Sequence, residues 1–277
     1  MAALLALCSA AAYGVGDFCG GMASKRASAA AVLLWSHVVG LALIVATTQV
    51  VTGVATAHDL LLGGAGGLAG ALGVGLLYRA LAIGPMSAVA PVTALLAAVV
   101  PIVAGFAEGE RPAATVLVGM ALALVAIVLV SAEGGGSLRP SDLRGVSLAL
   151  GAGLGFGLFF VALSHTGDAA GLWPIVGARV ASVGVVGALA LTRRVDAHVA
   201  TGAARPLTAA AGALDVTANL LYLLAIRQGL LSVVSVLSAL YPVSTVILAR
   251  IVLRERYAAL QRVGMVIAVP ATILMAR

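Results

Sequence analysis

ERPAATVLVGM, at residues 110–120, decides the architecture of this chain, because it returns 145 positions later as ERYAALQRVGM at residues 255–265. At the same offset, residues 80–129 match residues 225–274 at eighteen of fifty positions without a gap. Chance in so biased a composition gives roughly six such matches, so the chain contains two copies of one unit.

The composition identifies the solvent of this repeated unit. Apolar residues make up 62% of the chain and charged residues 9%, whereas soluble domains are about 45–50% apolar and about 25% charged. The solvent is therefore expected to be lipid. The net charge of +6 is explained by basic residues that flank membrane spans. No basic patch is interleaved with stacking aromatic residues, so we expect the lipid bilayer as a partner and no nucleic acid.

Polar breaks divide the chain into apolar stretches of about 20 residues, the length that crosses the hydrocarbon as a helix. The ten stretches are 2–22, 29–52, 60–82, 86–106, 113–132, 145–164, 170–192, 204–226, 230–253 and 258–276. Helices are required because lipid cannot satisfy backbone groups, and the alternating strands of a β-barrel do not appear. The longest break predicts a first five-helix repeat at 1–132, a polar linker at 133–144 and a second five-helix repeat at 145–277.

Five helices per repeat would insert the second copy upside down relative to the first. The predicted fold is an all-α polytopic membrane protein with ten transmembrane helices as two inverted five-helix repeats. Inverted repeats are typical of secondary transporters, with the substrate site between the halves near the midplane. Exchange of the two repeat conformations would then produce alternating access.

Short motifs in the two repeats, which are specific only as a set, resemble those of a known family. YRALAIGPMSAVAPV at 78–92, GERP at 109–112 and Gly119 resemble the first half of an EamA-type member of the drug/metabolite transporter superfamily. The motifs that resemble its second half are Tyr222, Tyr241-Pro242-Val243, Arg254-Glu255-Arg256, Gln261 and Gly264. The resemblance implies ten helices in two inverted repeats, and export or uptake of small metabolites, amino acids or drugs. We expect a multi-pass protein of the plasma membrane, the inner membrane of a bacterium.

The orientation in the membrane has two conflicting indications. Twelve Lys and Arg residues fall on the side opposite the N-terminus and three on its own side, which predicts both termini outside. The resemblance implies both termini in the cytoplasm. The first residues carry no positive segment, so we expect a membrane helix and no cleaved signal peptide.

Four ionisable residues lie inside the predicted spans, where a charge costs about 2.5–3.5 kcal/mol on insertion scales. They are Asp17, His37, Arg179 and Asp215. One hypothesis is that Asp17 or Asp215 exchanges a proton during transport while His37 or Arg179 tunes its pKa. The alternatives are a static Arg179–Asp215 pair and a His37 that only makes an interhelical hydrogen bond.

Polar residues on one helix face predict the wall of a cavity. Asp215, Asn219 and Tyr222 share one face of the eighth span at i, i+4 and i+7, and Tyr13 and Asp17 share one at i, i+4. Tyr78, Ser238 and Tyr241 add hydroxyls near span ends and prolines. The candidate substrate-binding residues are Tyr13, Asp17, His37, Tyr78, Arg179, Asp215, Asn219, Tyr222, Ser238 and Tyr241. The alternative for the stripe on the eighth span is interhelical hydrogen bonding alone.

The sequence favours a secondary-active transporter of a small-molecule solute, by alternating access and with proton coupling as a further hypothesis. No G-x-x-x-x-G-K-[ST] motif is present for nucleotides, and no H-E-x-x-H motif for a metal. We therefore expect no catalytic residue, cofactor or metal site, and a monomer or homodimer. The alternatives are an intramembrane enzyme and a non-transporting membrane subunit.

Overall fold

The protein is described from a computed structural model in which every regular element is helical. The structure describes residues 1–54, 56–83, 86–130, 140–192, 194, 196, 198, 203–252 and 258–276. Its α-helices are α1 (Ala2–Ser24), α2 (Ala29–Thr48), α3 (Ala57–Ile83), α4 (Met86–Ala107), α5 (Ala114–Val130), α6 (Pro140–Ser164), α7 (Trp173–Leu191), α8 (Ala204–Ile226), α9 (Leu231–Ser238), α10 (Tyr241–Val252) and α11 (Ala259–Met275). A short 3₁₀ helix, η1 (Asp168–Ala170), precedes α7.

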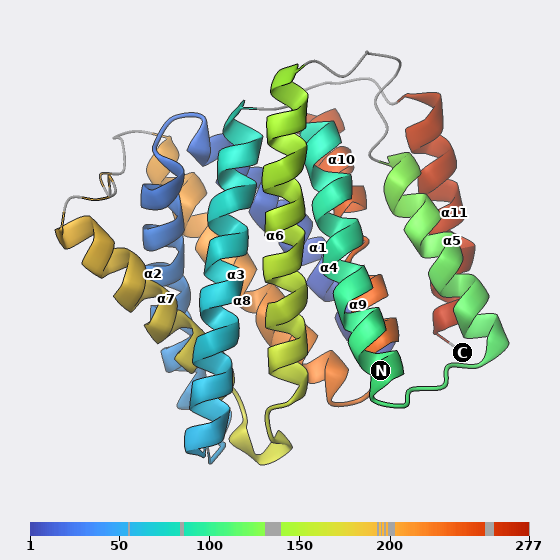
Figure 1. Ribbon diagram of the computed structural model, residues 1–277, viewed down its shortest axis with the longest axis horizontal. Coiled ribbons are helices and arrows are strands. Elements are labelled where there is room, and N and C mark those ends of the chain that lie inside the picture. Colours follow the sequence, from blue (N-terminus) through green and yellow to red (C-terminus); the bar gives the residue numbers. More distant parts are fainter. Residues whose placement is uncertain are drawn as a thin grey trace.

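These helices make ten membrane spans. Eight segments are long and apolar enough to cross a membrane, and the shorter apolar helices α5 and α11 complete the set. The helices alternate in direction from the end that carries both termini, so α5 and α11 lie side by side and run in opposite directions (Figure 1). The predicted fold class, with ten helices in two inverted repeats, is therefore confirmed.

Most helix bounds follow the predicted stretches, but the ninth span consists of two helices instead of one. The span Leu231–Val252 consists of α9 and α10, which are separated at Ala239 and Leu240. Pro242 is the second residue of α10 and has no backbone N–H to donate to the preceding turn. The ninth span is therefore broken at mid-depth in the bundle. Most of the predicted linker, residues 133–139, lies outside the described residues.

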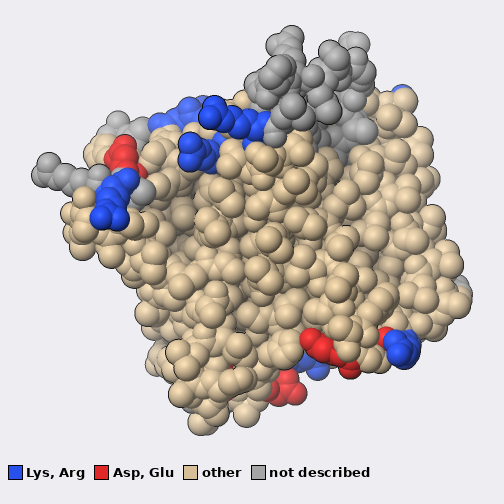
Figure 2. Space-filling model, in the orientation of Figure 1, with Lys and Arg blue, Asp and Glu red and all other residues tan. Residues whose placement is uncertain are grey.

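On the outer surface, charged residues lie at the two ends of the bundle (Figure 2). In Figure 2, Lys and Arg gather at the end away from the termini, and the belt between the ends carries no charged residue on this face. Large apolar side chains cover the outer faces of the helices, for example Leu61, Leu72 and Val266, which are 73%, 62% and 70% exposed. An apolar belt of this kind is matched by lipid and not by water.

Glycines let helices from the two repeats approach one another closely. A Cβ atom on Gly67 of α3 would lie 2.3 Å from Cα of Ala178 on α7. A Cβ atom on Gly212 of α8 would lie 2.2 Å from the carbonyl oxygen of Ser36 on α2. Small residues at such crossings allow backbone-to-backbone packing within the membrane. The interface between the repeats therefore forms around backbone contacts that leave little room for adjustment.

Candidate functional site

A cavity lies at mid-depth between the repeats, with walls from both of them. Its wall contains eight of the ten candidate residues: Tyr13, Asp17, His37, Tyr78, Arg179, Asp215, Asn219 and Tyr241. They come from α1, α2, α3, α7, α8 and α10, so residues far apart in the sequence meet here. Whether they bind substrate stays a prediction.

An ion pair between α7 and α8 occupies one side of the cavity. Nη2 of Arg179 donates to Oδ2 of Asp215, and the two side chains are 6% and 20% exposed. The guanidinium Nε of Arg179 has no hydrogen-bond partner among the described residues. The pair therefore neutralises Asp215 and leaves the Nε–H of Arg179 buried without a partner among the described residues.

The same face of α8 is joined to α1 by a chain of hydrogen bonds. The Tyr13 hydroxyl donates to Oδ1 of Asn219 at 2.6 Å, and Nδ2 of Asn219 donates to the Asp215 carbonyl at 2.7 Å. One turn closer to the N-terminus of α1, the Ser9 hydroxyl donates to the Ala218 carbonyl of α8 at 2.8 Å. These bonds engage both polar atoms of the Asn219 amide, so Asn219 holds Tyr13 in place.

His37 is fixed in one tautomer by its neighbour on α7. The Ser182 hydroxyl donates its single hydrogen to the Arg179 carbonyl at 3.1 Å. Nδ1 of His37, 2.8 Å from the same hydroxyl, is therefore assigned as the donor, which leaves Nε2 as an acceptor in neutral His37. Nε2 has no partner among the described residues. The interhelical bond expected of His37 exists, and its second nitrogen remains free.

Asp17 differs from Asp215 because its carboxylate has no ion pair or hydrogen bond with any residue in the described ranges. The cavity wall thus contains two carboxylates, from Asp17 and Asp215, and one guanidinium, from Arg179. If both carboxylates are ionised and His37 is neutral, the wall has one negative charge too many. An uncompensated charge is costly in a membrane interior, so a proton or a bound cation would stabilise the site.

Three phenylalanine side chains of one helix form part of the apolar wall. Phe156, Phe159 and Phe160 of α6 line the cavity, together with small residues such as Gly70 and Ala97. On α3, the Tyr78 ring lies against α1 where a Cβ on Gly20 would be 2.3 Å from it. The cavity therefore has a charged side on α1, α7 and α8 and an aromatic side on α6.

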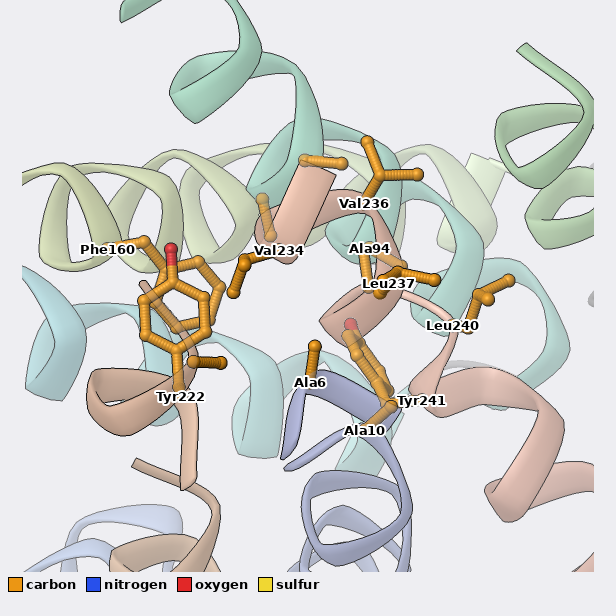
Figure 3. Close-up of a cluster of buried hydrophobic side chains, with 14 of the residues drawn as sticks. Ala6, Ala10, Ala94, Phe160, Tyr222, Val234, Val236, Leu237, Leu240 and Tyr241 are labelled. Carbon is orange, nitrogen blue, oxygen red and sulfur yellow. The ribbon is translucent and has the colours of Figure 1, made fainter. Parts of the chain in front are cut away.

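Tyr222 and Ser238, the other two candidates, are not among the residues that line this cavity. Tyr222 stacks on Phe160 with ring centroids 4.1 Å apart, and its hydroxyl lies 2.7 Å from that of Ser235. The Ser238 hydroxyl is directed at the Ala6 carbonyl, 3.4 Å away. Figure 3 shows Tyr222 and Phe160 in an apolar cluster with Val234 and Leu237 of α9. Tyr222 and Ser238 therefore belong to a packed layer on the side of the cavity that faces the termini.

Glu110 is a residue whose role the sequence did not indicate. Its carboxylate accepts from two backbone N–H groups at the start of α9. Its return as Glu255 in the repeat was the available signal, and Glu255 lies outside the described residues. Within the described ranges, no group of three His, Cys, Asp or Glu side chains could hold a metal ion.

Comparisons with known proteins agree with this architecture. The model of the EamA-like transporter family matches residues 1–132 and 143–277. A solved crystal structure of a protein superposes with a TM-score of 0.77, covers 99% of this chain and 95% of its own, and is 15% identical. At that identity the likeness shows a shared fold. No curated protein sequence matches the chain.

Proposed function

Because the chain belongs to the EamA-like transporter family, we propose that this membrane transporter is secondary-active and exchanges a small amine-bearing metabolite for a proton by alternating access. The observation that carries the proposal is the unpaired carboxylate of Asp17 beside the neutralised Arg179–Asp215 pair. We further propose that the protein acts in the plasma membrane.

The charge balance of the cavity supports one cation at a time. Asp215 is already paired, so Asp17 is the carboxylate that a proton or an ammonium group would neutralise. A proton and an ammonium group would compete for the same oxygen atoms. This competition is the chemical basis for coupling, because a transporter that can return only with Asp17 neutralised must carry one or the other.

Other polar atoms favour an amine that also bears an acceptor group. Nε2 of His37 is a free acceptor that an ammonium group would satisfy, and Nε–H of Arg179 is a free donor for a carboxylate or carbonyl. The phenylalanine side chains of α6 offer apolar contact to the body of the solute. Amino acids and related amines combine these features, and the aromatic faces add a favourable interaction with a cation.

The experiment compares probes that share a phenyl group and differ in charge. Thermal unfolding of the purified protein in detergent is measured with β-phenylethylamine, L-phenylalanine and 3-phenylpropanoate, alongside an aliphatic amine. A ligand that binds the folded state raises its stability, by about 2.7 kcal/mol at a concentration of 100 Kd. We expect the amines to raise the melting temperature and 3-phenylpropanoate to leave it unchanged.

Flux in proteoliposomes then tests coupling. A proton gradient should drive uptake of the labelled amine that stabilises the protein most, and Asp17→Asn should abolish the gradient-driven part. Asp168→Asn is the matched control, because Asp168 is exposed at a bundle end and does not line the cavity. Stabilisation by the anion alone would overturn the substrate class. Full proton-driven uptake in Asp17→Asn would overturn the role of Asp17.

A further inference from the structure

Glu110, in the loop between α4 and α5, binds the first turn of a helix in the other repeat. Its Oε1 accepts from the backbone N–H of Leu231 at 2.6 Å, and its Oε2 accepts from that of Ser232 at 3.1 Å. These are the first two residues of α9. A carboxylate at this position satisfies N–H groups that have no partner within their helix and complements the helix dipole. The contact therefore joins the repeats through charge-assisted hydrogen bonds.

Two glycines shape the loop so that the carboxylate reaches α9. Gly109 has a φ of +96°, a conformation that other residues adopt at a cost, and turns the chain directly before Glu110. Gly105 leaves the space that the side chain occupies, because a Cβ there would lie 2.4 Å from Oε2 of Glu110. The local sequence thus places one carboxylate against one helix end.

The helix that Glu110 holds is short and ends at the break described above. α9 extends from Leu231 to Ser238; Ala239, directly after it, and Tyr241, the first residue of α10, line the cavity. Glu110 therefore holds the first end of this eight-residue helix, and the break at Ala239 and Leu240 lies at its second end. Release at the first end would let α9 pivot about the second.

α9 also forms the layer that separates the cavity from the end of the bundle with the termini. Its Val234 and Leu237 are about 1% and 0% exposed and pack in the cluster that contains Phe160 and Tyr222 (Figure 3). A pivot of α9 would open this layer. We propose that Glu110 is the latch that keeps the cavity closed toward the termini, and that its release from α9 is the step that opens that side.

This latch rests on the alternating-access part of the proposed function and is tested by accessibility, without the need for a known substrate. The protein carries Cys8→Ser, Cys19→Ser and Ala97→Cys, since Ala97 lines the cavity, and a protease-cleavable tag at the C-terminus. It is reconstituted in liposomes and treated from outside with a membrane-impermeant thiol reagent and then with protease. Molecules that lose the tag have met the reagent from the termini side, and molecules that keep it have met the reagent from the opposite side.

We expect labelling of the Ala97→Cys protein mainly in the molecules that keep the tag. Glu110→Gln should shift the ratio of the two labelling rates at least tenfold toward the molecules that lose it, with a rise on one side and a fall on the other. Gly105→Ala, which displaces the carboxylate without removing it, should act in the same direction. Glu108→Gln is the matched control, because Glu108 lies in the same loop and pairs with His165 at 3.2 Å on the surface.

A merely structural Glu110 would lower the melting temperature and leave the ratio unchanged, and that result would overturn the latch. β-Phenylethylamine provides the separate test of alternating access. If the amine moves labelling between the two populations while Glu110→Gln does not, the latch is wrong and alternating access stands. If neither changes the ratio, both are wrong.

Discussion

The ion pair between Arg179 and Asp215 can be tested by removing its partners singly and together. Arg179→Met replaces a guanidinium that is 6% exposed with an apolar side chain of similar reach, and leaves Asp215 without its partner. Asp215→Asn removes the charge from the carboxylate and keeps its shape. The double variant removes both charges, so nothing buried remains unpaired.

The expected cost follows from burial. Removal of one partner of a fully buried pair costs about 3–5 kcal/mol, because the other charge is left uncompensated. Asp215 keeps a side-chain exposure of 20% toward the cavity, so the lower limit applies to Arg179→Met. About 3 kcal/mol corresponds to a change in the unfolding equilibrium on the order of a hundredfold. The double variant should lose less than Arg179→Met alone.

Unfolding in detergent micelles with increasing SDS measures these differences. A double-mutant cycle then gives a coupling free energy of about 2–3 kcal/mol if the pair is a static neutral unit. If the two single losses add within about 0.5 kcal/mol, the side chains do not act as a pair and Asp215 becomes a second candidate for the proton. Asp17→Asn should leave stability unchanged or raise it, because it removes an unpaired charge.

Two more substitutions test packing in the same unfolding assay. Gly67→Ala should destabilise the protein by about 1–3 kcal/mol, because its Cβ would overlap the α7 backbone at Ala178. Gly184→Ala is the control and should be neutral or stabilising, because nothing lies within 4 Å of its Cβ. Equal effects of the two substitutions would contradict the close approach of α3 and α7. Tyr222→Phe should keep the stack on Phe160 and cost about 1–2 kcal/mol, because it leaves the Ser235 hydroxyl without that partner; a neutral result would show that the hydroxyl has another partner.

The fold could be predicted because lipid leaves the backbone few choices. Apolar length fixed the number of spans, and the repeat together with an odd number of helices fixed the inversion. The break at Ala239 and Leu240 could not be predicted from Pro242 alone, since Pro91 and Pro101 lie inside an uninterrupted α4. Whether a proline bends or breaks a helix depends on the partners that its freed carbonyl groups find.

The charged side of the cavity was easier to predict than its aromatic side. Ionisable residues are rare in membrane spans, so the sequence indicated four candidates, and all four line the cavity: Asp17, His37, Arg179 and Asp215. Phe156, Phe159 and Phe160 gave no such signal, because an apolar residue that faces a cavity looks like one that faces lipid. Tyr222 shares a helix face with Asp215, but at a rise of about 1.5 Å per residue it lies about 10 Å further along the helix axis. This distance places Tyr222 in the packed layer between the cavity and the termini.

One hydrogen bond shows where the two repeats meet. His37 of α2, in the first repeat, bonds to the Ser182 hydroxyl of α7, in the second repeat, at 2.8 Å. The cavity wall that contains His37 also contains Arg179 of α7, so a substrate there would contact both halves.

The polar chemistry of the cavity breaks the symmetry of the two repeats. At the offset of 145 residues that relates the two repeats, Asp215 corresponds to Gly70 and Asn219 to Val74, and all four residues line the cavity. The symmetric positions, such as Gly67 and Gly212, serve close packing in both halves. Selection for rocking acts equally on both repeats, whereas a solute with distinct ends needs different groups on its two sides. We therefore expect the binding site at positions where one repeat is polar and its counterpart is small or apolar, and this comparison can be made from the sequence alone.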